Sequence, residues 1–269
     1  MSRFDADTAV VRVGPDLFEG AMSRDWWVVR GPNGGYVAAA ILRALEQRLA
    51  DPERHVRSLT VHYTATPAEG PVRIHTTIER AGRSLSTLSG RMIQGDRLLA
   101  LALAAFSKPW KDVEFHHASM PEAAPPEETP PGRGPRTGPS IPLHERYDTR
   151  WALGSPPFSG APEALAGGWI RLAEPRVADA AVVAALADAW TPSVFSWATP
   201  GVQIAAVPTI DLTVHFRASL PLKGAKADDY YLAVFRAREA REGFFEEDGE
   251  IWSRDGILMA QSRQLAILM

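Results

Sequence analysis

The sequence predicts an α+β fold made of two similar units, each with one long helix packed against an antiparallel sheet. Three observations lead to this fold class. A seven-residue segment recurs later in the chain, the predicted elements around each copy follow the same order, and a proline-rich stretch lies between the copies. A chain of 269 residues is long enough for two domains of ordinary size.

The repeated segment is the clearest sign of duplication. Leu59–Ala65 reads LTVHYTA and Leu212–Ala218 reads LTVHFRA, an offset of 153 residues. A helical pattern precedes each copy, and further strand-like patterns follow it. Because the order of elements is shared as well as the short match, duplication of one unit is the favoured interpretation.

In the first unit, apolar residues between Asn33 and Asp51-Pro52 recur at spacings of three and four, which indicates one buried face of a helix. Asn33 is a suitable N-cap and the proline ends the helix. A short strand is expected before it, at Trp26–Arg30. Alternating patterns bounded by turn residues predict four strands after it: Val56–Ala65, Val72–Arg80, Ser84–Gln94 and Leu98–Ser107.

The second unit repeats this plan. A short strand is expected at Trp169–Leu172 and a helix at Ala178–Phe195. The strands predicted after it are Thr209–Ala218, Tyr230–Arg238, Gly243–Ser253 and Ile257–Ile267. Short connections between successive strands imply an antiparallel sheet in each unit, and two such sheets can join edge to edge.

The two units are predicted to be separated by a connection rather than by a third domain. Eight prolines lie between Pro121 and Pro142, so this stretch can neither continue a helix nor pair as a central strand. We therefore divide the chain into an N-terminal unit at 1–110, a proline-rich connection at 111–165 and a C-terminal unit at 166–269.

Composition excludes several classes of function. The formal net charge of −3 gives no basic surface for nucleic acid. The chain has no cysteine, which rules out disulfides, a thiolate nucleophile and cysteine-bound zinc. No apolar run approaches the length of a membrane span and the N-terminus has no signal-like core, so we expect a soluble cytoplasmic protein without a metal or cofactor of its own.

A single acidic residue interrupts the second predicted helix. From Ala180 to Trp190, Asp188 is the only polar residue among alanine, valine, leucine and tryptophan. A helix that is apolar on every side is normally enclosed on every side, and an enclosed carboxylate needs hydrogen-bond partners or a chemical role. The alternative is a solvated residue near the end of the helix, since Thr191-Pro192 follow closely.

With these elements in place, the chain resembles the acyl-CoA thioesterase II family. The resemblance rests on the order of elements, on Asn33-Gly34-Gly35 at the start of the first helix and on Val207–Asp211, VPTID, at the start of a strand. It implies a double hotdog fold and hydrolysis of a fatty acyl-CoA to the free acid and CoA. It also implies assembly into a homodimer or homotetramer, with CoA present only as part of the substrate.

The resemblance also suggests roles for three side chains. Family members hold and activate the attacking water with an Asp, a Thr and a Gln, and the matching positions are Asp188, Thr209 and Gln264. Gln261 is a nearby competitor for the last role. Without the resemblance, Thr209 could be an ordinary β-branched strand residue, and Gln264 an outward-facing residue of an edge strand.

Asn33, Gly34 and Gly35 are the candidate substrate-binding residues. Backbone N–H groups at a helix N-terminus can face a carbonyl oxygen or a CoA phosphate. Close packing of the helix beneath a strand would explain the same glycines. The resemblance is imperfect here, because family members often carry an aromatic residue where this chain has Asn33.

Two other functions remain compatible with the sequence. A hotdog enoyl-CoA hydratase would need a histidine beside Asp188, and none is placed there by sequence. A non-catalytic acyl-CoA-binding protein would lack one member of the proposed set, whereas here each member has a candidate.

Overall fold

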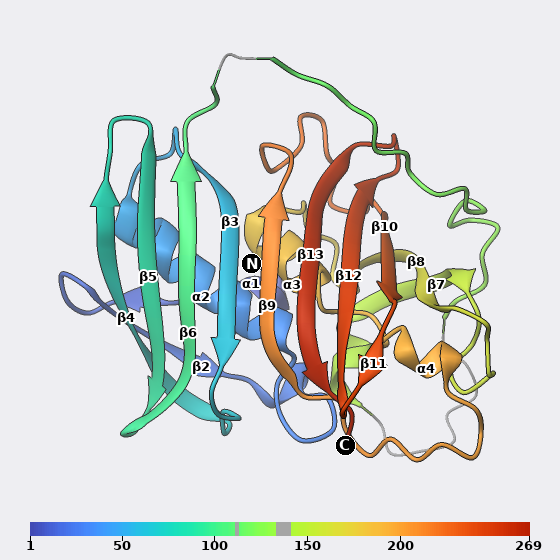
Figure 1. Ribbon diagram of the computed structural model, residues 1–269. Coiled ribbons are helices and arrows are strands. Elements are labelled where there is room, and N and C mark those ends of the chain that lie inside the picture. Colours follow the sequence, from blue (N-terminus) through green and yellow to red (C-terminus); the bar gives the residue numbers. More distant parts are fainter. Residues whose placement is uncertain (111–112, 133–140) are drawn as a thin grey trace.

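The computed structural model describes residues 1–110, 113–132 and 141–269, and these form one large antiparallel sheet with helices on one face (Figure 1). The strands are β1 (Val11–Arg12), β2 (Leu17–Met22), β3 (His55–Tyr63), β4 (Gly70–Ala81), β5 (Leu85–Gln94), β6 (Arg97–Ser107), β7 (Tyr147–Gly154), β8 (Ala164–Leu172), β9 (Thr209–Phe216), β10 (Tyr231–Ala237), β11 (Ala240–Arg241), β12 (Phe244–Ser253) and β13 (Leu258–Ile267). The helices are α1 (Arg3–Asp7), α2 (Gly34–Leu49), α3 (Ala180–Leu186) and α4 (Val194–Trp197), with 3-10 turns η1 (Arg24–Trp26) and η2 (Pro142–Glu145).

The two halves of the sheet meet at β3 and β9, the strands that carry the repeated segment. The strand order is β1-β2-β4-β5-β6-β3-β9-β13-β12-β10-β8-β7, with β11 paired to β12. Thr60 lies directly opposite Thr213, and their hydroxyl oxygens are 3.0 Å apart. Because these threonines occupy equivalent repeat positions, the junction is a local pseudo-twofold axis. The predicted double hotdog architecture is confirmed.

The long helix of the first half follows its sequence pattern closely. The Asn33 side chain accepts a hydrogen bond from the Tyr36 N–H, which caps α2. The helix ends at Leu49, and Ala50 adopts a left-handed conformation with φ 52°. Strand β5 presents alternating buried residues to this helix. The N-cap at Asn33 and the end of the helix before Asp51-Pro52 agree with the prediction.

The second helix is shorter than predicted. We expected Ala178–Phe195 to be helical, but α3 ends at Leu186 and α4 is a separate turn. Pro192 prevents a continuous helix. In addition, the Asn33 side chain donates to the Asp188 carbonyl oxygen at 2.6 Å, so a neighbouring element satisfies an acceptor of the chain just after α3.

Other sequence expectations need correction at the outer parts of the sheet. Trp26–Arg30 is not a strand: Trp26 is the last residue of η1, and only an isolated bridge joins Trp27 to Pro32. The strand expected before α2 is instead β2, which pairs with β4. The range 111–165 contains β7, which pairs with β8. The three domain boundaries stay a prediction.

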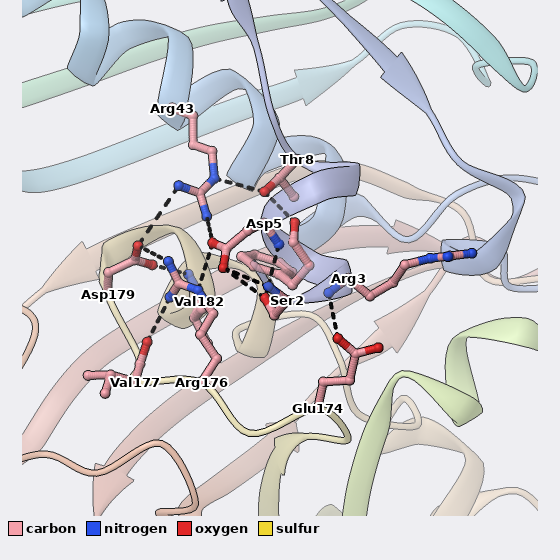
Figure 2. A network of polar contacts seen from close by, with 11 residues as sticks. Ser2, Arg3, Asp5, Thr8, Arg43, Glu174, Arg176, Val177, Asp179 and Val182 are labelled. Atoms are coloured by element: carbon pink, nitrogen blue, oxygen red, sulfur yellow. Dashed lines mark hydrogen bonds and ion pairs between the residues drawn. The ribbon is translucent and has the colours of Figure 1, made fainter.

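The N-terminal helix α1 links the two halves on the helical side of the sheet (Figure 2). The Asp5 carboxylate accepts hydrogen bonds from Arg43 of α2 at 2.9 Å and from Arg176 at 2.8 Å. Arg176 also donates to Asp179, the N-cap of α3, at 2.5 Å. This cluster ties the C-terminal part of α2 to the start of α3.

No helix in the described ranges is long and apolar enough to cross a membrane.

Candidate active site

Asp188 lies where the end of α3 meets the start of α2. Its Oδ2 accepts hydrogen bonds from the Asn33 side-chain amide at 3.0 Å and from the Gly35 N–H at 2.9 Å. Both of these hydrogen bonds end at the same oxygen, Oδ2. The start of α2 therefore fixes the orientation of the carboxylate through Oδ2.

The surroundings of Asp188 keep its proton affinity unusually high. Burial raises the pKa of Asp188 to about 7, and the nearby charge of Glu247 acts in the same direction. Hydrogen bonding by the Gly35 and Gly34 backbone and by Asn33 opposes this rise. The end of α3 adds the negative end of a helix dipole, whereas the start of α2 supplies the positive end. A carboxyl with a pKa near neutrality can exchange a proton at physiological pH.

Thr209 and Gln264 come together on neighbouring strands. The Thr209 hydroxyl donates to Gln264 Oε1 at 2.9 Å, and Gln264 Nε2 donates to Glu247 Oε2 at 2.7 Å. The other oxygen of Glu247 accepts from both the N–H and the hydroxyl of Ser193, at 2.6 and 2.7 Å. Gln264 and Glu247 are buried, so this is a continuous interior chain of polar groups.

The structure distinguishes the two candidate glutamines. Gln264 is 6% exposed and bonds to Thr209. Gln261 accepts a hydrogen bond from Arg217 at 2.9 Å in an exposed contact. Gln264 is therefore the glutamine that lies in the interior beside Thr209, and its catalytic role stays a prediction.

Asp188 and the Thr209–Gln264 pair do not bond directly to each other. Two observations place them in one region: the charge of Glu247 raises the pKa of Asp188, and the Ser262 hydroxyl contacts the Ala187 carbonyl oxygen at 3.5 Å. Ser262 precedes Gln264 on the same face of β13. Asp188 and the Thr209–Gln264 pair thus lie on either side of the contact between the end of α3 and β13.

Gly34 and Gly35 allow the start of α2 to approach Asp188 and the end of α3 closely. A Cβ on Gly35 would lie 2.6 Å from the Ala185 carbonyl oxygen, and one on Gly34 would lie 2.9 Å from Asp188 Oδ2. The Gly35 N–H already bonds to Asp188. Close packing, the alternative interpretation, therefore explains these glycines, and direct contact with a substrate stays a prediction.

Glu247 was not among the predicted site residues, although the alternating pattern of its strand indicates that it faces inward. It lies in the acidic run Glu246–Asp248, which is typical of a solvated face. In β12 the buried residues alternate, so Glu247 shares the inner face with Phe245 and Ile251. An acidic residue in phase with buried apolar neighbours indicates a carboxylate turned into the protein.

Tyr147 was also missed, because β7 lies within the range assigned to the connection. Its hydroxyl is buried and has no hydrogen-bond partner in the described part of the chain. The charge of Asp188 contributes to the raised pKa of Tyr147, after the larger effect of burial. An unpaired buried donor therefore lies within electrostatic range of Asp188.

Only the second half of the duplication carries the polar chain. Gln264 lies opposite Leu212 in the sheet. The repeat equivalent of Leu212 is Leu59, and the residue opposite Leu59 is Ala104, so Ala104 is the counterpart of Gln264. Glu247 pairs with Gln264 as Leu88 pairs with Ala104. By the repeat offset, the counterpart of Thr209 is Val56. The three counterparts in the first half are all apolar and buried: Val56, Leu88 and Ala104.

Comparison with known families agrees with this architecture. Residues 23–107 match the N-terminal domain of acyl-CoA thioesterases, and residues 121–268 match the C-terminal domain. The chain belongs to the acyl-CoA thioesterase family. Thioesterase domains thus cover both halves of the sheet, including the segments that carry Asn33, Asp188, Thr209 and Gln264.

Similar proteins are found among bacteria. A hotdog protein of unknown function from Alicyclobacillus acidocaldarius has a TM-score of 0.88 and 29% identity, over 100% of this chain and 98% of its own. The acyl-CoA thioesterase II TesB2 from Mycobacterium marinum has a TM-score of 0.79 and 19% identity, over 99% and 98%, and supports the fold alone. The uncharacterised protein Rv0499 of Mycobacterium tuberculosis is 26% identical, over 94% of this chain and 91% of its own.

Proposed function

We propose that this thioesterase hydrolyses a fatty acyl-CoA, or a related thioester, with Asp188 as the general base. One observation carries the proposal: a buried carboxylate with a pKa of about 7 is held in place through Oδ2 by Asn33 and Gly35. Hydrolysis needs a base whose pKa lies near the working pH, and an ordinary surface aspartate does not meet that need.

Thr209 and Gln264 would position the attacking water. Since the Thr209 hydroxyl donates its proton to Gln264, its oxygen is free to accept a hydrogen bond from water. Gln264 Nε2 uses one proton for Glu247 and keeps a second for the water oxygen. A water that donates to Asp188 Oδ1 and Thr209, and accepts from Gln264, retains one lone pair for attack.

The reaction then balances with no further reactant. The water oxygen bonds to the thioester carbonyl carbon while Asp188 takes the water proton. The tetrahedral intermediate collapses, the carbon–sulfur bond breaks, and the CoA thiolate recovers a proton from Asp188. The products are the free acid and CoA, and the base returns to its initial state.

The Tyr147 hydroxyl is a candidate donor of a hydrogen bond to the oxyanion. It is buried, unpartnered in the described residues and close enough to Asp188 for their charges to interact. A donor aimed at developing charge in a water-poor site can contribute several kcal/mol to catalysis. The Gly35 N–H cannot serve in this way while it bonds to Asp188.

The direct test is thiol release from a panel of acyl-CoAs of different chain lengths. Asp188→Asn keeps the shape of the side chain and an oxygen for the Gly35 N–H, but removes the base, so we expect kcat/KM to fall at least about a hundredfold. Asp248→Asn is the control, because Asp248 pairs with Arg263 at the surface. Full activity in Asp188→Asn would exclude this mechanism, and binding without turnover in the wild type would favour a non-catalytic acyl-CoA-binding protein.

We also propose, on the family resemblance, that the enzyme works in the cytoplasm as a homodimer or homotetramer and takes CoA only as part of its substrate.

A further inference from the structure

Glu247 is an unusual residue in the interior of this protein. It is 3% exposed, and no lysine or arginine pairs with it among the described residues. It accepts three hydrogen bonds, two from Ser193 and one from Gln264. Burying a carboxylate without a cation is costly, so a purely structural site would be better served by an apolar residue.

Glu247 constrains the direction of the two hydrogen bonds that run from it through Gln264 to Thr209. Both oxygens of the Glu247 carboxyl accept hydrogen bonds, so Gln264 turns its amide nitrogen toward Glu247. The amide oxygen then faces Thr209, and Thr209 must donate to it. As a result, the Thr209 oxygen presents lone pairs rather than a proton to the site.

We infer that Glu247 is a positioning residue, which sets the direction of the hydrogen-bond chain through Gln264 and Thr209 and so fixes how the attacking water is held. This inference rests on the proposed hydrolysis. It adds a residue that does not touch the substrate and acts through Gln264.

The first half of the molecule provides a natural comparison. The position equivalent to Glu247 is Leu88, which faces Ala104 across the equivalent pair of strands, β5 and β6. The fold therefore accommodates an apolar residue at this point without a polar partner. The carboxylate is present only where Gln264 and Thr209 are present, as a role in positioning requires.

Glu247 also acts on Asp188 through its charge. Among the described residues, the groups that interact most strongly with Asp188 through charge include Glu247, Tyr63 and Tyr147. Burial raises the pKa of Glu247, Glu246 adds to the rise, and the hydrogen bonds from Ser193 and Gln264 oppose it. Removing the charge of Glu247 therefore lowers the pKa of Asp188.

The experiment compares Glu247→Gln, Glu247→Leu and the control Asp248→Asn by steady-state hydrolysis of acyl-CoA across pH. Glutamine has nearly the same shape but can also donate, so it no longer forces one direction on Gln264. We expect kcat to fall about ten- to hundredfold in Glu247→Gln with KM nearly unchanged. We also expect the acidic limb of its kcat/KM profile to move to lower pH, whereas Asp248→Asn should match the wild type.

Glu247→Leu reproduces the residue of the first half and should lose activity to a similar or greater extent. If it does not fold, Glu247→Gln alone decides. Wild-type kcat and an unshifted acidic limb in Glu247→Gln would overturn the inference. Asp188→Asn and Gln264→Ala separate the two proposals: if they are fully active the proposed hydrolysis fails, and if they are impaired while Glu247→Gln is not, only the role of Glu247 fails.

Discussion

At the scale of single residues, the central feature is the pKa of Asp188, on which its surroundings have opposing effects. Burial and the charge of Glu247 raise its pKa to about 7, against hydrogen bonds from the start of α2. A general base works only when it is deprotonated. If Asp188 is the proposed base, its raised pKa means that activity is lost as the pH falls through about 7 rather than through the usual carboxylate range near ~4.

The sequence itself singled out Asp188, whereas the candidates Thr209 and Gln264 came from the family resemblance, and neither source revealed the contacts that these side chains make. Asp188 stood out because no other polar residue lies between Ala180 and Trp190. Its contact with Asn33 joins residues 155 apart, which no local pattern reveals. Glu247 was hidden by its acidic neighbours, although its phase with Phe245 and Ile251 in β12 marked it as inward-facing.

At the scale of elements, the close approach of α2 to α3 determines where Asp188 lies. Gly35→Ala would place a methyl group 2.6 Å from the Ala185 carbonyl oxygen, so the two helices must separate. We expect a loss of about 1–3 kcal/mol in the free energy of unfolding, measured by denaturant titration, together with lower activity. Gly201→Ala is the matched control, because nothing lies within 4 Å of the added Cβ. Equal stability of the two variants would show that this contact does not position Asp188.

Elements with a clear repeat of apolar residues could be predicted from the sequence, and elements whose ends depend on contacts with distant residues could not. The core strands from β3 to β6 and from β9 to β13 alternate clearly or lie between turn residues, and α2 has both an N-cap and a terminating proline. The end of α3 depends on Asn33 from the other half of the chain. β7 follows a stretch rich in proline, so its pairing with β8 could not be inferred from its surroundings.

At the scale of the whole molecule, the duplicated halves have diverged at their equivalent sites. The second half carries Thr209, Glu247 and Gln264 where the first carries Val56, Leu88 and Ala104. At the other end of α2, ion pairs from α1 join the two halves instead (Figure 2). The pseudo-twofold axis thus relates a polar interior site to an apolar one.

The N-terminal cluster should stabilise the joined halves. Asp5 has a lowered pKa: burial acts to raise it, but hydrogen bonds from Ser2 and Arg176 and the charge of Arg176 together outweigh that effect. Its contribution is therefore present above the ordinary carboxylate pKa of 3.8 and is lost as the pH falls below it. We expect Asp5→Asn to lower the free energy of unfolding by about 1 kcal/mol at pH 7, with the difference disappearing in acid. The same substitution at exposed Asp16 should have little effect, and a pH-independent difference for Asp5→Asn would rule out the ionic explanation.

The most direct test of the account is the pH dependence of kcat/KM for acyl-CoA hydrolysis by the wild-type enzyme. If Asp188 accepts the proton of the attacking water, activity should rise with pH along an acidic limb centred at about 7. A limb centred at the ordinary carboxylate pKa, near ~4, would contradict the assignment of Asp188 as the base.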